Sequence, residues 1–248
     1  MEQSPALTEL WETALPVAEN FEPMRWVDRP EPVRRYLEHA IAPGTPLATA
    51  VRLKMHGQIK LKNWCRFNAE QVIRWDRGMI WRAVVKMYGL PISGFDRLLD
   101  GTGAMQWKAI GIIPIMSATG PDIDRSAAGR LAAEFIWLPS AFCREEVRWS
   151  AAASDRIRAE FHVGDQAVQL EFGLDISGRV RYNRLQRWGN PEGGAHHYAE
   201  FGALVEEEGR FGGYTIPTRL RVGWHLGSPR FETEGEFFRC VIDQAEYR

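Results

Sequence analysis

Three polar side chains recur at four-residue intervals within an apolar segment. Ser126, Arg130 and Glu134 alternate there with alanine, leucine and other apolar or small residues. Residues four apart lie on the same side of an α-helix, so these side chains should form a narrow stripe, with Trp137 near it, on a helix over about residues 122–138. If the stripe faces water, Arg130 and Glu134 form a weak exposed pair. If it lines a pocket, Glu134 is an acid–base candidate whose ionisation Arg130 controls.

A further candidate acid–base group is Asp96, in the glycine-rich segment Gly94–Gly103. We interpret this segment as a loop, in which Asp100 is a turn residue because aspartate before glycine is common turn chemistry. Asp96 is less readily explained by a turn. Paired carboxylates in an apolar cleft could perform acid–base chemistry, because burial raises the pKa of one of them. The candidate catalytic residues are therefore Glu134, Arg130 and Asp96.

Aromatic side chains supply the candidate ligand-binding residues. The chain has ten tryptophans, which either pack in the core, as aromatics do in any β protein, or line an apolar pocket. His196 and His197 follow a glycine-rich loop; adjacent strand residues point to opposite faces, so the pair is not expected to bind one metal ion, although one histidine could be a general base at a cavity mouth. The candidate ligand-binding residues are Trp81, Trp107, Ser126, Trp137, Trp188 and His196.

Several function classes are disfavoured by what the sequence contains. The 31 basic and 32 acidic residues leave no basic excess for nucleic acid. Walker, dinucleotide-binding and serine-hydrolase motifs are absent, and so are metal-ligand spacings, so we expect no cofactor and no metal. The three cysteines are far apart, which favours free thiols in a reducing compartment.

Membrane insertion and export are also not expected. The longest apolar stretch, Ala109–Met116, is too short to span a bilayer. Met1–Pro16 lacks the basic start and apolar run of a signal peptide. These features predict a cytoplasmic protein, and they leave its oligomeric state open.

The period of the hydrophobic pattern predicts a mainly β (α+β) fold. Apolar residues alternate with polar ones from position 51 to 62, so the buried face of a long strand should carry Val51, Leu53, Met55, Ile59 and Leu61. Short turns join most of about ten predicted strands, which favours an antiparallel sheet.

Particular segments define the predicted strands and the domain. Phe67–Trp75 and Met79–Tyr88 should form a hairpin, and Ala104–Ser117 a single strand. We expect a single domain over residues 1–248, with a helical arm at 1–50 packed on a curved half-barrel at 51–248 and one buried helix laid across it.

Seven segments resemble those of a bacterial family of unknown function, over about residues 30–243. They are Pro32–Leu37, Gly94–Asp96, Gly120–Asp122, Arg125–Glu134, Trp137–Pro139, Arg187–Pro191 and Phe211–Pro217. In the last third of the chain, a turn, a strand and the sequence Gly-Gly-x-x-Ile-Pro follow one another in an order that also resembles the lipoprotein-carrier (LolA/LppX-type) fold. That resemblance implies an antiparallel half-barrel whose concave side is plugged by a helix and binds lipids or other apolar molecules.

Three functions remain open at this point. The first is binding of a hydrophobic or lipid-like small molecule, and the second is a cofactor-independent cyclase, isomerase or lyase acting on an apolar substrate in the same cavity. The third is an interaction scaffold filled by its own side chains. The number of charged groups that face the cavity should separate these functions. A cavity without charged groups favours carriage, and two or more mutually placed charged groups favour catalysis. Absence of a cavity favours a scaffold.

Overall fold

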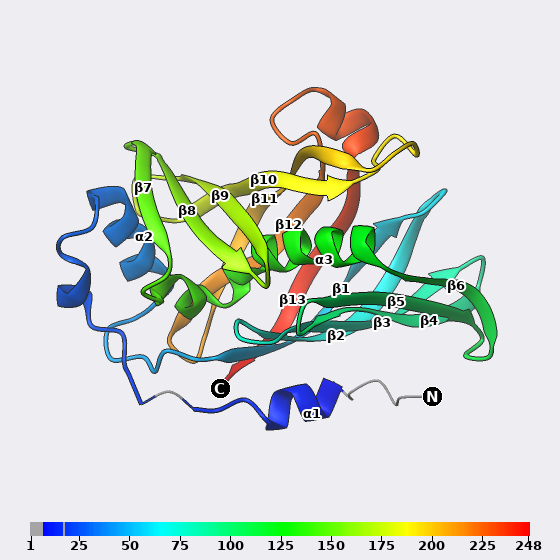
Figure 1. The fold of residues 1–248 in the computed structure, drawn as a ribbon, viewed down its shortest axis with the longest axis horizontal. Coiled ribbons are helices and arrows are strands. Elements are labelled where there is room, and N and C mark those ends of the chain that lie inside the picture. Colours follow the sequence, from blue (N-terminus) through cyan, green and yellow to red (C-terminus); the bar gives the residue numbers. More distant parts are fainter. Residues whose placement is uncertain (1–6, 17) are drawn as a thin grey trace.

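The chain folds around one long, curved antiparallel sheet (Figure 1). The structure is a computed structural model and describes residues 7–16 and 18–248. In these residues the sheet has 13 strands in the order β6-β5-β4-β3-β2-β1-β13-β12-β11-β10-β9-β8-β7. The strands are β1 (Ala50–Lys60), β2 (Trp64–Arg74), β3 (Gly78–Met87), β4 (Leu90–Leu99), β5 (Thr102–Ala109), β6 (Ile113–Thr119), β7 (Arg148–Ala153), β8 (Arg156–Val163), β9 (Gln166–Leu174), β10 (Val180–Gly189), β11 (His197–Phe211), β12 (Tyr214–Trp224) and β13 (Glu236–Tyr247).

The order of the strands divides the sheet into two meandering halves. β1 to β6 run from the centre to one edge, and β7 to β13 run from the other edge back to the centre, where β13 pairs with β1. Within each half, strands that follow one another in the sequence are therefore neighbours in the sheet, as short connections between antiparallel strands require. The predicted mainly β fold with a curved antiparallel sheet is confirmed.

The alternation that predicted the first long strand describes β1 correctly except at its end. Val51, Leu53 and Met55 are fully buried, and Ile59 is partly buried. The prediction for Leu61 is wrong: β1 ends at Lys60, and Leu61 is 51% exposed in the turn to β2. A side chain beyond the last ladder pair has no neighbouring strand to cover it.

Two other segments differ from their predictions. Gly94–Gly103 is not a loop, because β4 continues to Leu99 and only the residues after it turn into β5. The segment 104–117 is two strands rather than one. Ile110 (φ +46°) and Gly111 (φ +77°) take left-handed backbone angles between β5 and β6, and this reverses the chain.

One long helix, α3 (Pro121–Glu134), lies between the two halves of the sheet (Figure 1). It contacts β4, β5 and β6 on one side and β8, β9 and β10 on the other. Its continuation to residue 137, predicted as α-helix, is a 3-10 turn. The short helical turns are η1 (Pro23–Trp26), η2 (Phe135–Trp137), η3 (Pro139–Cys143) and the π-helical η4 (Phe231–Gly235).

The N-terminal arm contributes two helices, α1 (Leu7–Glu12) and α2 (Glu31–Ala40). α1 contacts β1, β2 and β3, and α2 contacts β7, β8 and β12, so both pack on the sheet. The proposed absence of a signal peptide in Met1–Pro16 falls partly on residues 1–6, which lie outside the described residues. None of the described helices is both long enough and apolar enough to cross a membrane.

Candidate functional site

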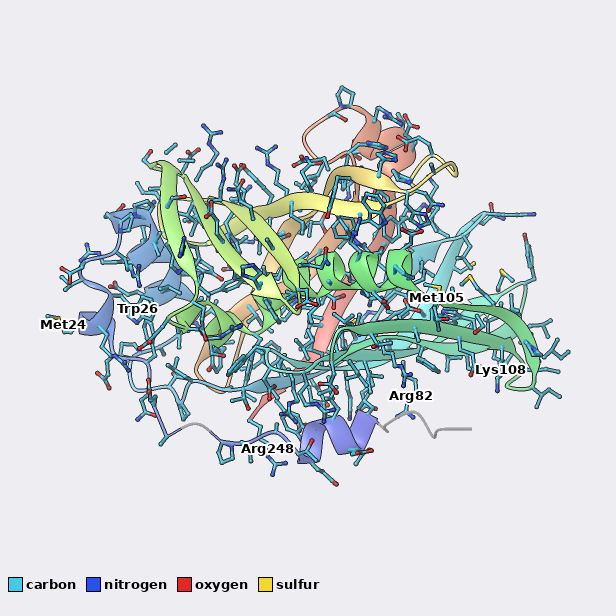
Figure 2. The ribbon with its side chains drawn as sticks, viewed as in Figure 1. Met24, Trp26, Arg82, Met105, Lys108 and Arg248 are labelled. Carbon is cyan, nitrogen blue, oxygen red and sulfur yellow. The ribbon has the colours of Figure 1, made fainter. Side chains whose placement is uncertain are left out.

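A cavity of about 250 Å³ lies between α3 and the sheet. Both halves of the sheet contribute to its lining, and Met105 of β5 lies beside α3 (Figure 2). The lining residues are Ile59, Trp81, Asp96, Met105, Arg130, Ala133, Glu134, Ile136, Trp137, Asn183, Arg187, Phe201, Gly202, Ala203, Leu220, Val222, Phe237 and Phe238.

Two rows of cross-strand partners form most of the sheet's share of this lining. Side chains paired directly across antiparallel strands point to the same face of the sheet. In one half, Trp81 on β3 pairs with Asp96 on β4, which pairs with Met105 on β5. In the other half, the continuous row from β10 through β11, β12 and β13 to β1 is Asn183, Ala203, Val222, Phe238 and Ile59.

Arg130 joins the two candidate carboxylates at the cavity wall. Its Nη1 donates to Asp96 Oδ2 at 2.8 Å, and its Nε donates to Glu134 Oε1 at 2.7 Å. The remaining carboxylate oxygens accept from Trp107 Nε1 (3.0 Å, to Asp96) and Gln71 Nε2 (2.6 Å, to Glu134). All four carboxylate oxygens therefore already have a donor.

Burial and charge act in opposite directions on Arg130. Burial alone would lower the pKa of its guanidinium, but Glu134 and Asp96 raise that pKa above its ordinary value. The three side chains are only 13–21% exposed. Hydrogen bonds from Arg130 to both carboxylates therefore hold the Asp96–Arg130–Glu134 triad in one geometry.

Arg187 on β10 is the second cation at the cavity. Its Nε donates to the Ser126 carbonyl at 3.0 Å, its Nη2 donates to the Ser126 hydroxyl at 3.3 Å, and its guanidinium carbon lies 4.4 Å from the Phe201 ring centre. No carboxylate among the described residues lies within 4.0 Å of it. Burial, followed by the nearby charge of Arg130, lowers its pKa to about 9.

The sequence-predicted residues divide into three groups. Glu134, Arg130, Asp96, Trp81 and Trp137 line the cavity. In a second group, Trp107 and Ser126 lie behind the lining, where Trp107 bonds Asp96 and Ser126 bonds Arg187.

Trp188 and His196 form the third group, away from the cavity. Their rings stack on each other with centres 6.3 Å apart, and Trp188 Nε1 donates to Asp122 Oδ1 near the start of α3. Both side chains are partly exposed, so the structure does not bring them together with the other predicted ligand-binding residues.

Sequence reasoning missed Arg187 and Asn183. A usable signal was present, because Asn183, Leu185 and Arg187 alternate on one face of β10, and buried Leu185 marks that face as the inner one. A polar residue on either side of a buried leucine, at period two, indicates polar groups on the inner surface. Gln71, which is fully buried in β2, was also missed.

A wider, open groove of about 770 Å³ crosses β1, β2, β3, β12 and β13. It is polar, and its cations include Arg221 and Arg239, which both bond Glu236. Its basic side chains are therefore partly neutralised by the protein itself, and it offers less apolar surface than the cavity beneath α3.

The described residues contain no group of three or more His, Cys, Asp or Glu side chains placed to hold a metal ion. Cys65, Cys143 and Cys240 are free thiols. Burial raises the pKa of Cys143 to about 12 and raises that of Cys240 further, so neither thiol is reactive near neutral pH.

Residues 28–247 match the model of a family of unknown function, DUF6920. The chain belongs to this family. The family of unknown function expected from the sequence is thus confirmed. A comparison with curated proteins gave no match.

Two solved structures are similar to the chain. One is a LolA superfamily protein from Nitrosomonas europaea, with 10% identity and a TM-score of 0.45 over 88% of this chain and 92% of that one. The other is a putative outer membrane lipoprotein-sorting protein domain from Vibrio parahaemolyticus, with 8% identity and a TM-score of 0.39 over 80% of this chain and 85% of that one.

Proposed function

We propose that this protein binds a hydrophobic small molecule in the cavity between α3 and the sheet. The observation that carries the proposal is the row of apolar side chains that lines the cavity from β11 to β1, faced by Ile136 and Trp137 of η2. Small-molecule sites are usually apolar pockets with a few placed polar groups, and this cavity has that composition.

An enzyme is the second candidate, favoured by the four charged groups at the cavity. Asp96, Arg130, Glu134 and Arg187 meet the condition of two or more mutually placed groups that favours catalysis. Binding is favoured instead because most of the lining is apolar and because donors of the protein already hold both carboxylates in place. We therefore rank binding first, with a cyclase, isomerase or lyase reaction as the alternative.

Titration with 1-octanol, followed by calorimetry, tests the binding proposal with a neutral apolar probe. Ala203→Leu should weaken binding, because Ala203 is buried in the cavity wall and a larger side chain there occupies ligand space. Ala167→Leu on the exposed face of β9 is the matched control and should leave binding unchanged.

Native mass spectrometry of freshly purified protein provides a second readout, since a bound molecule would add a discrete mass. The same molecule recovered chemically unchanged after long incubation favours binding, and its conversion favours the enzyme. Absence of any bound mass, together with no uptake of apolar probes by the wild-type protein, would contradict both candidates.

We also propose the cytoplasm as the site of this function, because three free, widely separated cysteines suit a reducing compartment. Fractionation of cells that express the untagged chain would check this location.

A further inference from the structure

The polar groups at the cavity are not all satisfied by the protein. The triad accounts for both carboxylates and for Arg130, as described above. Three lining groups remain: the Arg187 guanidinium, the Trp81 indole N–H and the Asn183 side-chain oxygen. Trp81 and Asn183 are 2% and 1% exposed, and neither Trp81 Nε1 nor Asn183 Oδ1 has a hydrogen-bond partner among the described residues.

The assignment of these atoms as one donor and one acceptor is fixed by their neighbours. Asn183 Nδ2 donates to the Ala133 carbonyl at 2.8 Å, which leaves the side-chain oxygen as the unpartnered atom. Trp81 Nε1 is a donor by its chemistry. A buried polar atom without a partner costs about 1–3 kcal/mol, so a ligand that offers an acceptor to Trp81 Nε1 recovers part of that cost.

Charge selects the chemistry of the ligand. Arg130 bonds two carboxylates directly, whereas the Arg187 guanidinium bonds the neutral Ser126 and lies over two aromatic rings, Phe201 and Trp224. Asp96 and Glu134 act on the charge of Arg187 only from beyond 4.0 Å. A buried cation is stable when it is paired and hydrogen-bonded. Arg187 is therefore the charged group at this cavity whose pairing the protein leaves incomplete, and an anion is the group that completes it.

Size limits the hydrocarbon part. A cavity of about 150 Å³ holds benzene, so the 250 Å³ available here accommodates a ligand of about ten non-hydrogen atoms by simple proportion. That volume excludes a lipid with two or more long acyl chains lying wholly inside.

We propose that the cavity takes a small monocarboxylate, such as a medium-chain or aromatic acid, whose carboxylate pairs with Arg187 and accepts from Trp81 while its hydrocarbon part lies against Val222 and Phe238. The inference rests on the proposed function, because it specifies the ligand of the same cavity. It differs from that proposal because it requires the ligand to carry a negative charge.

Three probes of one chain length separate charge from hydrophobicity: octanoate, 1-octanol and octylammonium, titrated near neutral pH by calorimetry. We expect octanoate to bind the wild-type protein at least about tenfold more tightly than 1-octanol, as a charge-assisted hydrogen bond allows. Octylammonium should bind most weakly. This comparison needs no variant and so does not depend on any variant's stability.

Arg187→Gln adds the residue-level test, because glutamine keeps a side-chain donor for Ser126 but removes the charge. It should weaken octanoate at least about tenfold and 1-octanol by less than about threefold. Arg184→Gln is the matched control on the opposite face of β10, where Arg184 pairs with Glu171 and Glu200, and it should leave both affinities unchanged.

The outcomes separate the two proposals. Equal or tighter binding of 1-octanol by the wild-type protein would overturn the carboxylate assignment and leave the binding proposal standing. Equal weakening of both probes by Arg187→Gln would overturn the role of Arg187 in ligand pairing. If no probe binds the wild-type protein, both proposals are wrong.

Discussion

Replacing Arg130 with methionine should strongly destabilise the protein, because it leaves Asp96 and Glu134 without their shared cation. Both carboxylates lie within 2.8 Å of Arg130 atoms and are at most 21% exposed. Removing one partner from a buried ion pair costs about 3–5 kcal/mol, which corresponds to a fall of about 6–20 °C in the melting temperature of a chain this long. Thermal and urea unfolding, followed by far-UV circular dichroism, measures this loss.

The pH dependence of that loss identifies its cause. Without Arg130, burial and mutual repulsion raise the pKa of one carboxyl group above its unfolded value. The variant's folded state then keeps its proton to higher pH, so its stability falls as the pH rises through the raised pKa. The gap between wild type and Arg130→Met should therefore narrow as the pH falls.

Two comparisons complete the test of this reasoning. The triple variant with Asp96→Asn and Glu134→Gln removes the charges left behind and should recover more than half of the loss. Arg230→Met is the matched control, since Arg230 also bridges two glutamates, Glu192 and Glu234, but is 47% exposed, and it should melt close to the wild type. A triple variant no more stable than Arg130→Met, or an equally large effect of Arg230→Met, would refute the argument.

Two further predictions concern stability outside the cavity. Burial would raise the pKa of Glu236, but hydrogen bonds from Arg221 and Arg239 lower it to about 2. The ionised Glu236 therefore contributes up to about 3 kcal/mol to the free energy of unfolding above pH 4.5, and this contribution is lost as the pH falls toward 2. The stability difference between wild type and Glu236→Gln, measured by urea unfolding, should accordingly disappear in acid. Gly57→Ala should lower the free energy of unfolding by at least about 1–3 kcal/mol, because an added Cβ would lie 2.0 Å from the Arg239 carbonyl oxygen on β13. Gly194→Ala meets no atom within 4 Å and should melt like the wild type; similar melting of both glycine variants would contradict the β1–β13 contact.

The sequence predicted the fold best in strands that have one buried face and one solvent-exposed face. The alternation from Val51 to Met55 fixed the inner face of β1, because a strand with one buried face has a period of two. The apolar segment at 110–116 misled for the opposite reason. It forms a turn and the edge strand β6, where Ile113, Ile115 and Met116 are exposed, so hydrophobicity there does not report burial.

β11 was missed because its pattern is interrupted. The pairing of β11 with β12 shifts register between Val205 and Glu207 and again between Glu207 and Glu208, so side chains change faces within the strand. The charged run Glu206–Glu208, which by composition alone is typical of a solvated turn, lies inside this irregular part of β11. Period-two reasoning cannot follow a strand across such shifts.

At the candidate site, the spacing of residues along the chain predicted only the contacts that lie within one helix. The four-residue interval placed Arg130 and Glu134 on one stripe of α3, and the structure pairs them at 2.7 Å. Asp96 was chosen for its residue type, although its segment was assigned to a loop rather than to β4. Arg187 meets α3 through a strand about sixty residues away along the chain, and only the strand order shows that β10 faces the helix.

The polar contacts of α3 explain why the site residues also belong to the framework. Gln71 and Asp96 bond the helix from one half of the sheet, and Asn183 and Arg187 bond it from the other. Apolar packing alone tolerates sliding and rotation of a helix, whereas directional bonds from two sides fix its rotation and its position along the axis.

Gly129 makes one of these contacts sterically feasible. A Cβ at that position would lie 2.9 Å from Arg187 Cγ, so the absence of a side chain on the helix gives the arginine room to reach Ser126. The same guanidinium both anchors α3 and faces the cavity. Pairing it with an anion would therefore change the charge balance of a group that holds the helix, and ligand binding and the position of α3 should be energetically coupled.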